Sequence, residues 1–166
     1  QSHENVQFFL PRAHTIDRSE LESFINERNV PVTITEDHTY DLMQICDVCL
    51  AASGTATLET AMMELPTVLL YKVSPITYGI GKMVVNLTHV GLPNIVAGKE
   101  VIPELLQDDV SADAIVKTVL PLLDDLQVNQ HMRSELRSVK EKLGESGAVN
   151  RVAQLIYDLG KEKTNE

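Results

Sequence analysis

Residues 47–59 have the sequence Asp47-Val48-Cys49-Leu50-Ala51-Ala52-Ser53-Gly54-Thr55-Ala56-Thr57-Leu58-Glu59, which predicts a strand, a tight turn and the start of a helix. Residues 48–52 are apolar, as in a buried strand, and residues from about 56 to 64 are good helix formers. The first N–H groups of a helix have no partner within it, so they bind anions well. The stretch therefore predicts an anion site at the end of a strand. The alternative is that Ser53 or Thr55 only caps the helix and Gly54 only turns the chain.

The same alternation of strand and helix continues on both sides of this stretch. Further strands are expected at residues 6–10, 31–35 and 67–71, with a very short one at 95–97, and helices near 21–25, 42–45 and 76–87. Beyond Gly98 the sequence predicts only helices, at about 101–107, 111–124, 127–143 and 148–161. Strands that are apolar without alternation are typical of parallel sheets covered on both faces. We therefore expect an α/β fold with about five parallel strands, helices on both faces and a helical C-terminal extension.

Composition and charge exclude several classes of protein. The 166 residues include 14 Lys and Arg against 24 Asp and Glu, a net charge of −10 without a basic cluster, so we expect no nucleic-acid partner. No apolar run is long enough to span a membrane. Two cysteines are too few for a disulfide scaffold and suit a reducing cytoplasm. Residues 51–100 have balanced charge, so they are the part of the chain least repulsive to an anionic ligand.

Most familiar catalytic and cofactor motifs are missing. The stretch around Gly54 matches neither the P-loop pattern nor the three-glycine dinucleotide fingerprint, so ATP and NAD are not indicated. Cys46 and Cys49 have the spacing of a redox or metal pair, but we interpret both as small core residues, because a zinc site needs a second pair of ligands. There is no His-Glu-x-x-His pair and no nucleophile elbow. We expect no metal and no cofactor.

Two polar residues outside the turn are further candidates for ligand binding. Glu59 lies in the first turns of the predicted helix, where it can hydrogen-bond a ribose or simply benefit from the helix dipole. Asn94 follows Pro93 in a predicted loop, where it can contact a ligand or its own backbone.

Four sequence blocks resemble the bacterial lipid-A-disaccharide synthase family, and they occur in its order and spacing. They are Ser53-Gly54-Thr55-Ala56-Thr57-Leu58-Glu59, Tyr71-Lys72, Leu92-Pro93-Asn94-Ile95-Val96-Ala97-Gly98 and Pro103-Glu104-Leu105-Leu106-Gln107. The resemblance extends from about residue 6 to residue 123. It implies half of a GT-B glycosyltransferase, in which two Rossmann-like domains face each other and the C-terminal one binds the nucleotide sugar.

The resemblance also implies the reaction. The family transfers 2,3-diacylglucosamine from UDP-2,3-diacylglucosamine to 2,3-diacylglucosamine 1-phosphate, which gives lipid A disaccharide 1-phosphate and UDP. The displacement is inverting and needs no metal. Because the substrates are acylated, the family acts in the cytoplasm, peripherally at the inner membrane of Gram-negative bacteria, and residues 72–90 become candidates for contact with acyl chains.

The resemblance assigns roles to particular residues of this chain. Phosphate contacts are expected from Ser53, Gly54, Thr55 and Thr57, and a ribose contact from Glu59. Asn94 is expected to reach the diphosphate or the donor sugar. The remaining expected donor-site residues shape the adjoining loop and helix; they are Gly98, Glu104 and Gln107.

The chain also departs from the family. A full synthase is more than twice as long, and the acceptor-binding N-terminal half, which holds the catalytic base, has no counterpart here; nor does the Gly-Ser-Arg block with its phosphate-binding arginine. We divide the chain into a truncated UDP-sugar-binding domain, residues 1–125, and a helical extension, residues 126–166. We expect no catalytic residue in this chain, no transfer by it alone, and a partner in the missing half or in a second copy that pairs through the last helices.

Two other functions stay open from the sequence. One is a different GT-B enzyme that uses a UDP-sugar, either a transferase or an epimerase. The other is a non-enzymatic α/β interaction module that retains an anion site without using it.

Overall fold

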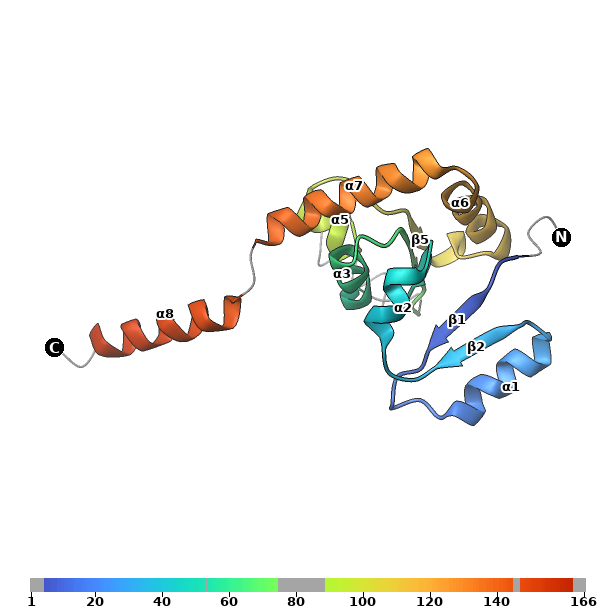
Figure 1. The fold of residues 1–166 in the computed structure, drawn as a ribbon, viewed down its shortest axis with the longest axis horizontal. Helices are drawn as coiled ribbons and strands as arrows, with labels where there is room; N and C mark the ends of the chain where they lie inside the picture. The colour runs from blue at the N-terminus through green and yellow to red at the C-terminus, as the bar shows by residue number, and fades with distance from the viewer. Residues whose placement is uncertain (1–4, 53, 75–88, 145–146, 163–166) are drawn as a thin grey trace. The chain divides into compact units, whose positions relative to one another are not determined.

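The computed structural model describes residues 5–52, 54–74, 89–144 and 147–162, and they form two compact units (Figure 1). The first unit ends at Cys46 and the second begins at Asp47. This boundary lies far from residue 125, where the sequence suggested a functional division. That division stays a prediction. The helix expected at 76–87 lies outside the described residues.

In its described residues, 5–46, the first unit contains two parallel strands and two helices. Strand β1 (Phe8–Pro11) pairs with β2 (Val32–Thr35), and helix α1 (Arg18–Arg28) connects them. The Asp17 side chain begins α1 by accepting a hydrogen bond from the Ser19 N–H, at 2.9 Å. Asn29 ends it in the left-handed conformation, with φ of 50°. Helix α2 (Thr39–Ile45) follows β2.

The second unit is built on a parallel sheet of three strands. Strand β4 (Thr67–Tyr71) lies between β3 (Cys49–Ala51) and β5 (Glu104–Leu106). Helix α3 (Gly54–Met62) connects β3 to β4, and α5 (Leu92–Ala97) precedes β5. The parallel α/β class predicted from the sequence is therefore confirmed.

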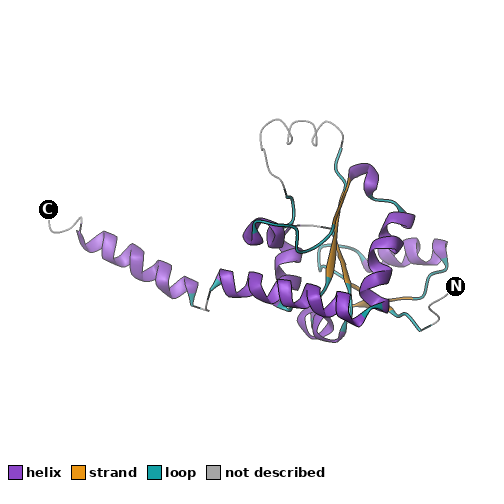
Figure 2. Cartoon of the chain, turned by 90° about the horizontal axis from the view of Figure 1, so that it is seen from above, coloured by secondary structure: helices purple, strands orange, loops and turns teal. Residues whose placement is uncertain are grey.

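Four helical segments follow β5, and the longest of them closes the core of the second unit. They are the 3₁₀ turn η1 (Gln107–Asp109), α6 (Ala112–Asp124), α7 (Leu126–Leu143) and α8 (Ala148–Glu162). Most of the described chain from residue 112 onward is thus helical (Figure 2). Helix α7 runs past α3 and α5 and contacts both (Figure 1). Its Leu136 and Val139 are buried beside Leu69 of the central strand, so α7 belongs to the core.

Two predicted elements are wrong. Residues 95–97, expected as a strand, lie in helix α5, and residues 104–106, expected in a helix, form strand β5. The reason lies in long-range contacts, because β5 gains its backbone partners from β4, with Leu69 opposite Glu104. The side chains of Cys46 and Cys49, both expected in the core, are only partly buried.

In the part of the chain that is described, no helix has both the length and the apolar composition needed to cross a bilayer.

Candidate functional site

The start of helix α3 lies at the carboxyl end of strand β3. Strand β3 ends at Ala51 and the helix begins at Gly54; the predicted ligand Ser53, between them, lies outside the described residues. Thr55 and Glu59 are both exposed, and four residues apart on a helix they share one face. The first N–H groups of α3 and these two side chains therefore form a polar surface that can meet a phosphate and a hydroxylated sugar.

The opposite face of α3 is buried, and the predicted ligand Thr57 lies on it. Its side chain is 0% exposed, and its Oγ1 donates a hydrogen bond to the Gly54 carbonyl oxygen at 2.6 Å. Thr60 is bound in the same way to the Thr57 carbonyl oxygen, at 2.9 Å. The predicted phosphate contact of Thr57 stays a prediction, while the described geometry gives its hydroxyl a role inside the helix.

Asn94 is the most completely hydrogen-bonded of the predicted ligands. Its side chain is 0% exposed. Its Nδ2 donates to the Ile102 carbonyl oxygen at 2.9 Å and to Glu104 Oε1 at 2.7 Å. Its Oδ1 accepts from the N–H groups of Val101 and Ile102, at 2.7 and 2.9 Å. These four bonds use the donors and acceptors of the amide, so the arrangement supports an organising role. Direct contact with the donor stays a prediction.

Gln107 lies at the same edge of the sheet as the start of α3, because it directly follows the parallel strand β5. Its Oε1 accepts from the Val73 N–H at 2.7 Å and its Nε2 donates to the Val73 carbonyl oxygen at 2.9 Å. Strands β4 and β5 pair as far as Tyr71 and Leu106, and the Gln107 amide continues this pairing beyond the end of β4. Gln107 fixes the backbone on this edge of the sheet.

The predicted residue Gly98 lies at the far end of α5. It is the C-cap of that helix, with φ of 74°, a conformation that favours glycine. Because the two glycines flank α5 and are seven residues apart, Gly98 is about 10 Å along the helix axis from Gly91. The structure thus separates Gly98 from the start of the helix, and its role toward the donor stays a prediction.

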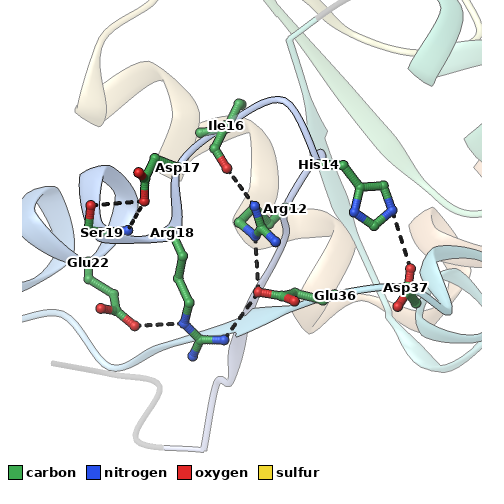
Figure 3. Close-up of polar contacts among 9 residues, drawn as sticks. All are labelled: Arg12, His14, Ile16, Asp17, Arg18, Ser19, Glu22, Glu36 and Asp37. Atoms are coloured by element: carbon green, nitrogen blue, oxygen red, sulfur yellow. Dashed lines mark hydrogen bonds and ion pairs between the residues drawn. The ribbon is translucent and has the colours of Figure 1, made fainter.

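A polar cluster that the sequence analysis did not select lies at the carboxyl ends of β1 and β2, in the first unit (Figure 3). Arg12 Nε donates to Glu36 Oε1 at 3.0 Å, and Arg18 bonds both Glu36 and Glu22. The hydrogen bond from Arg12 is the main cause that holds the pKa of Glu36 below its usual value. The segment between β1 and the first residue of α1 lines a hollow of about 450 Å³; the lining residues are Arg12, His14, Thr15, Ile16, Asp17 and Arg18.

The places of Arg12 and Glu36 in the sequence could have predicted this cluster. Arg12 lies two residues after the first predicted strand and Glu36 directly follows the second, so a parallel pairing brings them to one edge. Both arginines bond to carboxylates, which offsets the attraction that they would exert on an anion.

Within the described ranges, no three His, Cys, Asp or Glu side chains gather closely enough to hold a metal ion. The metal-free reaction implied by the resemblance stays an expectation.

Comparison with known proteins identifies the family. The model of a family described as lipid-A-disaccharide synthetase matches residues 1–156. The lipid-A-disaccharide synthase of Geobacter sulfurreducens is 44% identical over 159 residues, which cover 95% of this chain and 41% of that protein. The synthase of Syntrophotalea carbinolica is 34% identical over 162 residues, or 98% of this chain and 41% of that protein. The chain thus spans about two fifths of the length of these relatives, and it belongs to the lipid-A-disaccharide synthase family.

Proposed function

We propose that this chain is the part of a lipid-A-disaccharide synthase that binds the UDP-sugar donor. The observation that carries the proposal is the exposed face of α3 at the carboxyl end of a parallel strand, in a chain of this family. In open α/β sheets, ligands bind at this edge. The N–H groups at the start of α3 would bind the diphosphate, Thr55 would donate its hydroxyl to it, and Glu59 would accept hydrogen bonds from the ribose.

In the full-length enzyme, the donor would be UDP-2,3-diacylglucosamine and the acceptor 2,3-diacylglucosamine 1-phosphate. The positive end of α3 would stabilise the negative charge that develops on the departing UDP, which makes the transfer easier. The catalytic base and the acceptor site would come from the part of the relatives that this chain does not match. Pairing through the last helices and peripheral contact with the membrane belong to the same proposal.

A titration with UDP tests the donor site directly. In a ¹⁵N-labelled chain, UDP is expected to shift the amide resonances of residues 54–59, and ADP to shift them less. Glu59→Ala should weaken UDP binding by about tenfold, which corresponds to about 1.4 kcal/mol. Glu100→Ala is the matched control, because Glu100 is an exposed carboxylate outside α3.

The outcomes separate the three functions that the sequence left open. An interaction module without a working site would show no local response to UDP. Another GT-B enzyme would respond to UDP, but its full-length form would prefer a UDP-sugar without acyl chains. Formation of disaccharide by the 166-residue chain alone would contradict the expectation that transfer needs the other half.

A further inference from the structure

Glu104 is a carboxylate that lies almost entirely inside the protein. Its side chain is 8% exposed. Its Oε2 accepts from the Val90 N–H at 2.9 Å, and its Oε1 accepts from the Gly91 N–H at 2.9 Å and from Asn94 Nδ2 at 2.7 Å. His89 Nδ1 is 4.0 Å from Oε1. A buried carboxylate is tolerated only when donors surround it, and here two of its three close donors are backbone groups that lead into α5.

Gly91 fits closely against this carboxylate. A Cβ atom at Gly91 would come within 3.2 Å of Glu104 Oε1 and within 3.4 Å of side-chain atoms of Ile102 and Leu69. The backbone at Gly91 therefore lies close to strand β4, to strand β5 and to Ile102, which precedes β5. Its position is set by Glu104 through hydrogen bonds and by the core through contact.

The next residue, Leu92, lies beside the start of α3. Leu92 is the first residue of α5, and its Cγ would lie 3.8 Å from a Cβ at Gly54, which is ordinary van der Waals contact. Helices α3 and α5 pack against each other beyond this pair. A shift of Gly91 would thus move Leu92, whose side chain lies beside Gly54, the first residue of α3.

We propose that Glu104 is a positioning residue for the nucleotide site: it holds Gly91 and Asn94, and through Leu92 it sets the place of Gly54. It acts on the nucleotide through these groups rather than by touching it. The inference rests on the proposed function, since it assigns the nucleotide site to the start of α3. It predicts that removing the charge of Glu104 changes the start of α3 while the sheet stays folded.

Glu104→Gln is the sharpest variant. Glutamine has the same shape but only one acceptor oxygen, and its amide NH₂ would face an N–H donor, so at least one of the three bonds is lost. In the ¹⁵N-labelled chain without ligand, we expect the resonances of Gly54 and Thr55 to move, while the slow exchange of the β4 amides persists. UDP affinity should fall by about tenfold. Glu100→Gln, an exposed carboxylate four residues away, should change neither.

Leu92→Ala is the second variant and leaves the Glu104 hydrogen bonds in place. It should move the same Gly54 and Thr55 resonances and weaken UDP binding, which keeps the inference testable if Glu104→Gln does not fold. Unchanged Gly54 and Thr55 resonances, or unchanged UDP affinity, in a folded variant would overturn the inference. Failure of the unmodified chain to respond to UDP would instead overturn the proposed function, and the ligand-free comparison would still decide whether Glu104 positions α3.

Discussion

The Asn94 side chain hydrogen-bonds both the backbone before β5 and the carboxylate of Glu104. It is enclosed by the backbone of residues 101 and 102 and by the carboxylate of Glu104. Asn94 gives a hydrogen-bond partner to each of these groups. Asn94, expected in a loop, thus lies in helix α5, and its side chain organises the segment that the family resemblance assigned to ligand binding.

Replacing Asn94 tests this assignment through stability. Asn94→Ala removes four hydrogen bonds at a buried position and should lower the free energy of unfolding by about 3 kcal/mol. Urea denaturation followed by circular dichroism measures the loss. Asn150→Ala, at an exposed position of α8, should change the free energy of unfolding by no more than about 0.5 kcal/mol. A stable Asn94→Ala chain that has lost UDP binding would instead favour direct contact with the nucleotide.

Among the elements, α7 is the helix that holds the turn between α3 and β4. Glu64 in that turn has a left-handed backbone, with φ of 54°, which is uncommon for a residue with a side chain. Its Oε2 accepts from Arg137 Nε and Nη2 at 3.0 and 2.7 Å, Lys140 Nζ is 3.4 Å from Oε1, and Arg133 binds its carbonyl oxygen at 3.1 Å. Basic residues of α7 thus bind this turn beside the buried apolar stripe of the same helix.

This ion-pair cluster should make stability depend on pH. The hydrogen bond from Arg137 is the main cause that lowers the pKa of Glu64 in the folded chain. A lowered folded-state pKa contributes stability above the unfolded pKa, about 4.3, and that contribution is lost as the pH falls through the lower value. Because Arg137 is 62% exposed and Glu64 is 23% exposed, we expect only about 1 kcal/mol at pH 7.

Glu64→Gln provides the measurement. The difference in unfolding free energy from the unmodified chain should be largest near pH 7 and shrink as the pH falls below about 4. Glu141→Gln, an exposed carboxylate on α7, should show a small difference at every pH. An equal loss for Glu64→Gln at all pH values would mean that shape rather than charge holds the turn.

Across the whole molecule, burial is distributed unevenly between the two units. The buried apolar residues of the described chain lie from Ala51 onward. In the first unit no described residue is fully buried, and Phe8 and Phe24 are 50% and 60% exposed. Since burial of apolar surface is the main favourable term in folding, the second unit should hold most of the stability of this chain.

Hydrogen exchange should reveal this difference. The amides of β1 and β2 should exchange faster than those of β4, because local opening costs less where few apolar groups are buried. Mass spectrometry of peptides from residues 6–35 and 65–72 provides the comparison. Equal protection in the two peptides would contradict the expected difference in stability.

Local sequence was sufficient where an element is set by its own residues. Strand β4 has the predicted bounds, because Pro66 directly before it disfavours a helix and the five residues that follow, Thr67–Tyr71, are β-branched, apolar or aromatic. Helix α6 was predicted from its spacing, and the Ser111 hydroxyl accepts the capping bond from the Ala114 N–H. Local sequence was not sufficient to predict the secondary structure of residues 95–97 and 104–106, because these segments are short and have both helical and strand preferences.

The order of apolar runs, turns and hydroxyl groups along the chain was enough to establish the α/β class and the family resemblance, and to predict an anion site at the turn after β3. All of these depend on neighbours in sequence. Tertiary structure alone decided which of the polar side chains predicted for the site are exposed. Thr57 and Asn94 fit the family pattern as well as Thr55 and Glu59 do, yet the folded chain buries the first two and leaves the other two exposed. Exposure is a property of the packed fold, because it depends on which other parts of the chain cover a side chain.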